Sequence, residues 1–148
     1  MDDVTPMQAA LLEARAAARV GEVPVGAVVA RGRDVVARAH NLTRTLNDPT
    51  AHAEILAIRR ACDALGSDRL VGLDLHVTLE PCAMCAGAIA HARLARLYYG
   101  TSDPKGGGVE HGARVFAHPT CHHRPEVYDG IGATEAGALL RDFFHARR

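Results

Sequence analysis

The chain has 148 residues, of which 48% are hydrophobic and 23% charged, as is usual for a globular domain. Its 17 Lys and Arg residues balance its 17 Asp and Glu residues, so the total charge gives no argument for a nucleic-acid partner. No stretch approaches the roughly 20 apolar residues of a membrane span, and the start MDDVTPMQAA lacks the apolar run of a signal peptide. We therefore expect a single domain, residues 1–148, in the cytoplasm, with no membrane contact and with reduced cysteines.

The first half of the chain predicts a helix, a hairpin and a second helix. Thr5, Pro6 and Gln8 form a capping-box pattern, and the apolar stripe behind them continues to about Val20. Two apolar runs, 25–30 and 35–39, flank the turn signal at 31–34 and predict an antiparallel hairpin. A polar loop follows over 40–50. A second helix is expected to open at 48–50 and to end at Gly66.

The second half predicts strands that alternate with helices. We expect strands at 75–79, 97–100 and 127–128, a helix from Pro81 to about His91, and a C-terminal helix over 133–148. The Gly- and Pro-rich segment 101–125 is expected to be mostly loop. Strands joined by helices should run parallel through right-handed crossovers, so the order of elements predicts an α/β sandwich.

Two short motifs contain a set of metal-binding side chains. His52 lies two residues before Glu54, and Cys82 and Cys85 follow Pro81 at a spacing of three. Each motif lies at the expected start of a helix, where the positive end of the helix favours a thiolate. One histidine and two cysteines are a zinc-like donor set.

The number of ligands indicates catalysis rather than structure. Structural zinc sites usually have four protein ligands, whereas three leave one position open for water. Zinc lowers the pKa of that water from about 15.7 to about 7. Glu54 stands close enough in sequence to His52 to accept the water proton, so we predict it as the catalytic proton shuttle.

Each half of this pattern has other readings when it is taken alone. A lone Cys-x-x-Cys pair is typical of redox sites or of half a structural zinc site. Cys62, late in the second helix, is expected to lie in the core. Cys121 is followed by two histidines, which is a second metal-like cluster, although a complete site elsewhere argues against it.

The joint pattern matches the H-x-E…P-C-x-x-C signature of zinc deaminases. Nearly the whole chain resembles the bacterial tRNA adenosine deaminases, which convert the wobble adenosine of an anticodon to inosine. The segments that carry the resemblance are 22–28 (EVPVGAV), Asn41, 48–54 (DPTAHAE), 77–88 (VTLEPCAMCAGA), 103–107 (DPKGG), 123–128 (HRPEVY) and 139–144 (LLRDFF).

The resemblance implies a cytidine-deaminase-like fold, with a five-stranded mixed sheet in a three-layer α/β/α sandwich. It also implies a homodimer with one Zn²⁺ per subunit, which binds a tRNA anticodon stem-loop. Hydroxide on the zinc would attack carbon six of adenine while Glu54 moves protons. The residues that would contact the substrate are Val25, Asn41, Ala53, Asp103, Lys105, Phe144, Arg147 and Arg148.

Some features leave the contacts with RNA open. Phe143 and Phe144 are neighbours on a helix, so one is expected in the core and the other in a freer position. Arg147 and Arg148 suit either an RNA-facing edge or a solvated helix end. His122 stands where many members of that family have Asn, and the chain ends without a long basic tail.

Two other functions compete with this reading. The first is a zinc deaminase of a free base or nucleoside, such as guanine or cytosine, because guanine deaminases share the catalytic motifs. The second is a zinc-stabilised binding module without turnover. Glu54 argues against the second, because a purely structural metal site needs no free carboxylate.

Overall fold

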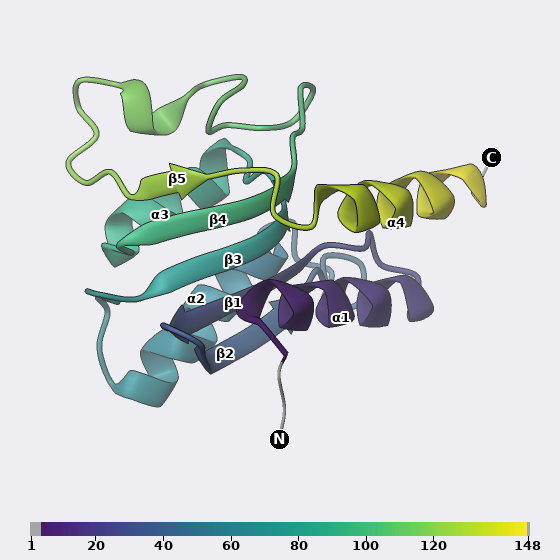
Figure 1. Ribbon diagram of the computed structural model, residues 1–148, viewed down its shortest axis with the longest axis horizontal. Coiled ribbons are helices and arrows are strands. Elements are labelled where there is room, and N and C mark those ends of the chain that lie inside the picture. The colour runs from purple at the N-terminus through teal and green to yellow at the C-terminus, as the bar shows by residue number, and fades with distance from the viewer. Residues whose placement is uncertain (1–3, 148) are drawn as a thin grey trace.

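The computed structural model describes residues 4–147 and contains a five-stranded mixed sheet between two pairs of helices (Figure 1). The elements in chain order are α1 Pro6–Arg19, β1 Gly26–Arg31, β2 Asp34–His40, α2 Ala53–Leu65, β3 Asp74–Leu79, α3 Ala83–Ala92, β4 Arg96–Thr101, the 3₁₀ turn η1 Val115–Ala117, β5 Glu126–Tyr128 and α4 Ala133–His145. This arrangement confirms the predicted α/β fold. No helix in the described part of the chain is both long and apolar enough to span a bilayer.

The sheet has the strand order β2-β1-β3-β4-β5. β1 pairs antiparallel with both β2 and β3, whereas β3, β4 and β5 run parallel to one another. β2 and β3, which α2 connects, therefore point the same way with β1 between them. Parallel strands end at the same edge of a sheet, so the segments after β3 and β4 meet there.

Most element predictions are confirmed, and the starts of two helices are corrected. The capping box of Thr5 and Gln8 is present, and Gly66 ends α2 in the left-handed conformation. α2 begins at Ala53 and not at 48–50, because the Asp48 carboxylate accepts hydrogen bonds from the backbone and hydroxyl of Thr50 in a local turn. α3 likewise begins two residues after Pro81.

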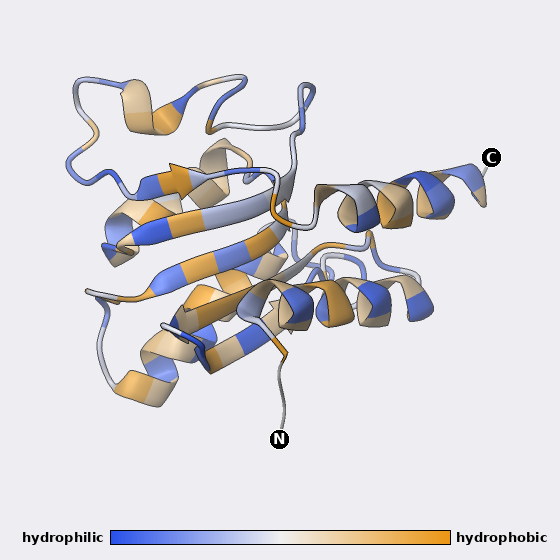
Figure 2. Ribbon diagram, in the orientation of Figure 1, coloured by the Kyte–Doolittle hydropathy of each residue, from blue (hydrophilic) through white to orange (hydrophobic). Residues whose placement is uncertain are grey.

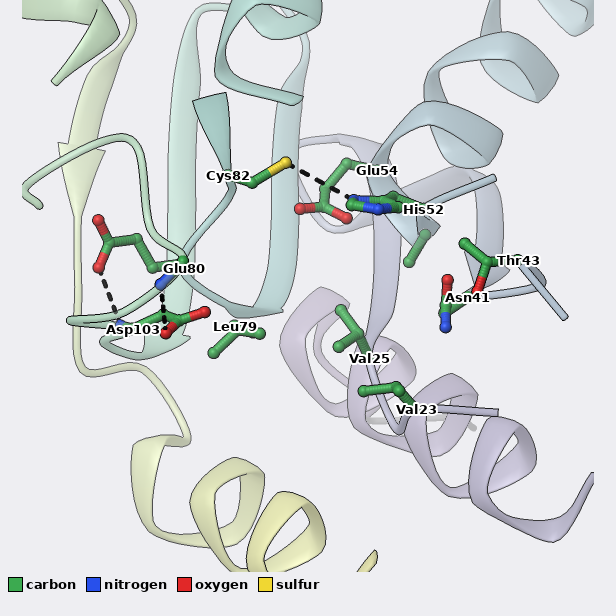
Figure 3. A pocket seen from close by; sticks show the side chains of 12 residues that line it. Val23, Val25, Asn41, Thr43, His52, Glu54, Leu79, Glu80, Cys82 and Asp103 are labelled. Carbon is green, nitrogen blue, oxygen red and sulfur yellow. Dashed lines mark hydrogen bonds between the residues drawn. The ribbon is translucent and has the colours of Figure 1, made fainter. Parts of the chain in front are cut away.

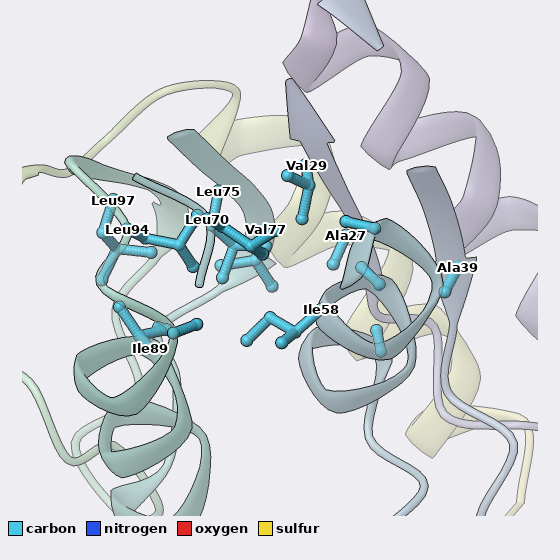
Figure 4. Close-up of a cluster of buried hydrophobic side chains, with 14 of the residues drawn as sticks. Ala27, Val29, Ala39, Ile58, Leu70, Leu75, Val77, Ile89, Leu94 and Leu97 are labelled. Carbon is cyan, nitrogen blue, oxygen red and sulfur yellow. The ribbon is translucent and has the colours of Figure 1, made fainter. Parts of the chain in front are cut away.

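Hydrophobic side chains fill both faces of β1. Ala27 and Val29 face the main core between the sheet and helices α2 and α3, while Val28 faces a smaller core under α1. Figure 4 shows Ile58 from α2 and Ile89 from α3 pointing toward the strands in the main core. In Figure 2, β1 is hydrophobic along most of its length, as expected of a strand buried on both sides.

Helix α1 lies directly on the backbone of β1. A Cβ atom added at Gly26 would lie 1.9 Å from the Ala10 carbonyl oxygen, so only glycine permits this approach. The main-chain amide of Gly26 also donates to the Thr78 hydroxyl of β3 at 3.2 Å. The contact fixes the N-terminal end of β1, and with it the segment 22–25 that leads to the pocket described below.

A row of three stacked rings crosses the sheet on the side of α1 and α4. His76 on β3 lies 4.5 Å from Tyr98 on β4, and Tyr98 lies 5.1 Å from Tyr128 on β5, measured between ring centroids. The Nε2 atom of His76 is buried and has no hydrogen-bond partner. Burial lowers the pKa of His76 from 6.5 to about 4.

This buried histidine predicts an acid-sensitive fold. Between pH 6.5 and 4 the unfolded chain binds a proton at His76 that the folded chain does not, so stability falls as the pH falls. Because of the lowered pKa of His76, the free energy of unfolding should fall by about 2 kcal/mol between pH 7.5 and about pH 5. His76→Phe keeps the stack and should reduce the loss between pH 7.5 and 5 by about that amount in urea titrations. Tyr98→Phe is the control and should leave the pH dependence unchanged.

Candidate metal centre and pocket

The three predicted metal ligands come together where two helices begin. His52 is the N-cap residue of α2, Cys82 is the N-cap residue of α3, and Cys85 lies in the first turn of α3. The Nδ1 atom of His52 lies 3.6 Å from the Cys82 sulfur and 3.5 Å from the Cys85 sulfur. Neither N-cap side chain makes a capping hydrogen bond, so both are available as ligands.

The spacing of these atoms fits a tetrahedral zinc ion. With Zn–N near 2.1 Å and Zn–S near 2.3 Å, a nitrogen and a sulfur in a tetrahedral site lie about 3.6 Å apart. The two observed N···S distances are 3.6 and 3.5 Å. Among residues 4–147 this is the one group of three or more His, Cys, Asp or Glu side chains with ligand atoms within 4.8 Å of one another. The set offers three protein ligands, as in zinc enzymes.

The two cysteines are electrostatically different. Hydrogen bonds from the Cys85 thiol and from His52 lower the pKa of Cys82 to about 4. The contact with the Cys82 sulfur, together with burial, raises the pKa of Cys85. Hydrogen bonding to Cys82 also raises the pKa of His52. The thiolate form of Cys82 is therefore favoured at this helix start, and a bound cation favours deprotonation of the second thiol as well.

Glu54 lies in the first turn of α2 with its side chain beside His52 and Cys82 (Figure 3). It is 4% exposed. Burial raises the pKa of Glu54 from 4.5 to about 7, against the opposing effects of its backbone N–H and of His52. A carboxyl group of this kind is able both to accept and to release a proton near neutral pH.

A cavity of about 330 Å³ opens beside this group. The residues that line it are Val23, Val25, Asn41, Thr43, His52, Ala53, Glu54, Leu79, Glu80, Cys82, Asp103 and Gly106. Figure 3 shows Val23, Val25 and Asn41 on the opposite side of the cavity from Asp103. The predicted contact residues Val25, Asn41, Ala53 and Asp103 therefore share one cavity with Glu54.

One wall of the cavity is held by a buried carboxylate. Glu22, 1% exposed, accepts hydrogen bonds from the backbone of Arg44 and from the backbone and hydroxyl of Thr45. Asn41 donates its amide to Glu22 at 3.5 Å. Burial alone raises the pKa of Glu22, but these hydrogen bonds outweigh it and lower the pKa. The charged carboxylate thus fixes the loop that presents Asn41.

The outer predicted contacts lie apart from this cavity. Lys105 and Phe144 line a neighbouring groove between the 101–106 segment and α4, together with Asp103. Phe143 is buried and Phe144 is 53% exposed, which confirms the expected division between these neighbours. The guanidinium of Arg147 lies 3.7 Å from the centre of the Phe143 ring, so it packs against α4, which ends two residues before it. Arg148 lies outside the described residues.

The remaining cysteines take part in packing. Cys62 is partly buried against the main core, as expected of its place in α2. Cys121 donates to the carbonyl of His123. His122 packs near His91, with 5.2 Å between ring centroids. The Cys121–His123 segment does not join the metal group found in the described chain.

Two functional candidates received no role from sequence reasoning. Glu22 and Glu80 are buried carboxylates that accept hydrogen bonds from the two loops on either side of the cavity. In a sequence, glutamate normally marks the surface. The available signal was their position, because Glu22 directly precedes the apolar run 23–29 and Glu80 directly follows the expected strand 75–79.

Comparison with known proteins shows which family the chain resembles. A family model described as MafB19-like deaminase matches residues 1–148. A protein of Agrobacterium fabrum named tRNA-specific adenosine deaminase is 58% identical over 142 residues, which cover 96% of this chain and 93% of that protein.

Solved structures agree with this relationship. One from a study of A-to-I editing by tRNA:A34 deaminases at the wobble position is 58% identical, with a TM-score of 0.89 over 91% of this chain and 98% of that one. Guanine deaminase from Bacillus subtilis is more distant, at 29% identity and a TM-score of 0.67, over 98% of this chain and 95% of that one.

Proposed function

The chain belongs to the MafB19-like deaminases and is an enzyme, and we propose that it converts the wobble adenosine of a tRNA anticodon loop to inosine. The main support is the 58% identity, along nearly the whole chain, to a protein named tRNA-specific adenosine deaminase, against 29% to a guanine deaminase. The reaction consumes one water and releases one ammonia. A base-sized cavity beside Glu54 and the three metal ligands supports it.

Different residues of the site would bind the metal and transfer protons. His52, Cys82 and Cys85 would hold the zinc ion, which, when bound, supplies the positive charge that lowers the pKa of water to about 7. Glu54, buried beside them, accepts the proton of the attacking water. It then gives that proton to ring nitrogen one of adenine and assists the departure of ammonia.

The walls of the cavity orient the base. Val25 provides an apolar surface, and Asn41 and the backbone of Ala53 offer hydrogen bonds to its polar edge. A base in an anticodon loop is already partly unstacked, so moving it into such a cavity costs less than extracting one from a duplex. Asp103, Lys105 and Phe144, around the neighbouring groove, would contact the flanking nucleotides.

Removal of the Asn41 amide should weaken recognition of the base. Asn41→Ala is expected to lower kcat/KM for an anticodon stem-loop about tenfold to hundredfold, because a buried polar group of the substrate loses its partner. Steady-state kinetics with the stem-loop give this number. Leu46→Ala, at a half-exposed position in the same loop, serves as the control and should leave kcat/KM unchanged.

The assembly of the enzyme also belongs to this proposal. We propose a cytoplasmic homodimer with one zinc ion per subunit. Light scattering combined with metal analysis tests both numbers together. A monomer at micromolar concentration, or a metal content far from one per chain, would contradict this part of the proposal without affecting the reaction.

A substrate panel tests the proposed reaction directly. Purified protein is incubated with an anticodon stem-loop that carries a wobble adenosine and, separately, with guanine, cytosine, cytidine and adenosine. Ammonia and inosine are then measured. The proposal predicts conversion of the stem-loop and little release of ammonia from the free compounds. If only free guanine or cytosine were deaminated, the tRNA assignment would be wrong and the free base would be the substrate.

A further inference from the structure

Glu80, at the end of β3 immediately before Pro81, is a buried carboxylate with an unusual set of donors. It is 2% exposed. One oxygen accepts from the backbone of Asp103 at 3.0 Å and contacts Nδ1 of His111 at 2.7 Å. The other accepts from the backbone amides of Val109, Glu110 and His111 at 3.2, 2.9 and 3.1 Å. Both oxygens are thus occupied by a single loop, residues 103–111.

This loop is pressed closely against Glu80 and the start of α3. A Cβ atom added at Gly107 would lie 2.4 Å from the Glu80 carboxyl carbon, and one at Gly108 would lie 2.5 Å from the backbone nitrogen of Ala83. The Gly108 amide also donates to the Pro81 carbonyl at 2.8 Å. Only glycine fits at either position, so the loop is shaped to bring its amides to the carboxylate.

The same loop forms the cavity wall that faces Asn41. Asp103 and Gly106 line the cavity, and the Asp103 carboxylate accepts from the amides of Lys105 and Gly106 at 3.2 and 2.9 Å. Figure 3 shows the bond from the Asp103 backbone to Glu80 at the edge of the cavity. The position of Asp103 therefore depends on an acceptor that directly follows β3 and is not in the loop itself.

We propose that Glu80 is a positioning residue for the deaminase reaction, which holds the 103–111 loop so that Asp103 and Gly106 form the substrate wall opposite Asn41. It acts through the loop and not on the substrate, because both of its oxygens are already occupied by loop donors. The role rests on the proposed function for its substrate. Its structural part, the control of the loop, holds for any base that the cavity accepts.

The test replaces Glu80 with Gln, whose amide keeps the size but offers one acceptor and turns an N–H donor toward other donors. We expect kcat/KM for the stem-loop to fall about hundredfold, with zinc content unchanged. Hydrogen exchange of the Asp103, Val109, Glu110 and His111 amides should speed up at least tenfold, while α2 and α3 keep their protection. Glu80→Asp restores the charge and should recover part of both losses.

A double-variant cycle separates positioning from general stability. If Glu80 acts by positioning the cavity wall that Asp103 and Gly106 form, Glu80→Gln should lower kcat/KM much less in the Asp103→Ala background than in the wild type. Glu126→Gln, an exposed carboxylate on β5, is the matched control and should change neither rate nor exchange. If Glu80→Gln does not fold, Gly107→Ala keeps both carboxylates in the sequence but places a Cβ atom against the Glu80 carboxyl group, which displaces the loop. The same pattern is expected from it.

The outcomes are distinct. Wild-type exchange in the loop and wild-type kcat/KM in Glu80→Gln would overturn the proposal, and so would fully additive losses with Asp103→Ala. Loss of zinc in step with activity would assign Glu80 to the metal centre instead. If wild-type protein deaminates only a free base, the proposed substrate fails, and the same ratios measured with that base still decide the role of Glu80.

Discussion

Glu54→Gln is expected to lower the turnover of the enzyme about a thousandfold or more while leaving zinc in place. General acid–base groups contribute about 10²- to 10⁴-fold, and in the proposed reaction one carboxylate serves both the attacking water and the departing ammonia. Glutamine has the same shape but neither accepts nor releases a proton near neutral pH. Single-turnover deamination of a stem-loop, with metal analysis on the same sample, measures both quantities.

The variant should also be at least as stable as the wild type. Glu54 is 4% exposed and its pKa is raised by burial, so a neutral amide removes a desolvation cost. Active sites commonly carry groups of this kind at the expense of stability. Glu13→Gln, on α1 and away from the cavity, is the control for the chemistry. Turnover above a tenth of wild type in Glu54→Gln would refute the assigned role.

Removal of the metal is the second change with a large expected effect. After treatment with a chelator, activity should fall below about 1% and return on addition of Zn²⁺, because the residues that line the cavity include no Lys or Arg to replace the charge that the ion would supply. Unfolding free energy should fall as well, by about 4 kcal/mol when free zinc was about a thousand times its dissociation constant. Thermal or urea unfolding with and without zinc measures this loss.

Matched cysteine variants localise the effect. Cys82→Ser should lower zinc affinity and activity together, since a hydroxyl is a poorer ligand than a thiolate. Cys121→Ser, at a partly exposed thiol outside the metal group, should retain both. Full activity of the metal-free protein would rule out the proposed chemistry. If zinc were lost from Cys121→Ser but retained by Cys82→Ser, the zinc site would have to be assigned to the segment that contains Cys121.

The metal group was predictable from sequence because its residues lie at helix starts. Two local spacings mark the group, that of Cys82 and Cys85 and that of His52 and Glu54. Neither spacing depends on loop lengths or on packing elsewhere in the chain. The start of α2 was placed too early for a local reason. Asp48 resembles a helix cap, but its carboxylate accepts hydrogen bonds from Thr50 within a turn. The helix therefore begins only at Ala53.

Where the outer predicted residues lie relative to the cavity could not be predicted from sequence, because their placement depends on how distant segments meet. Lys105 and Phe144 share a groove only because the segment after β4 lies beside α4. Arg147 looks like a free charge in the sequence, yet it packs on the Phe143 ring. Glu80 belongs to a recognisable motif, but its five donors come from a loop more than twenty residues away.

Wobble specificity is tested most directly by comparing two anticodon stem-loops with wild-type protein. One carries its single loop adenosine at the wobble position, and the other carries it at the next nucleotide. Inosine is located by sequencing of the product RNA. We predict inosine at the wobble adenosine and at least hundredfold slower conversion of its neighbour, because in the proposed complex the cavity and the groove beside it fix the register of the RNA loop. Equal conversion of both adenosines, or of neither, would contradict the account.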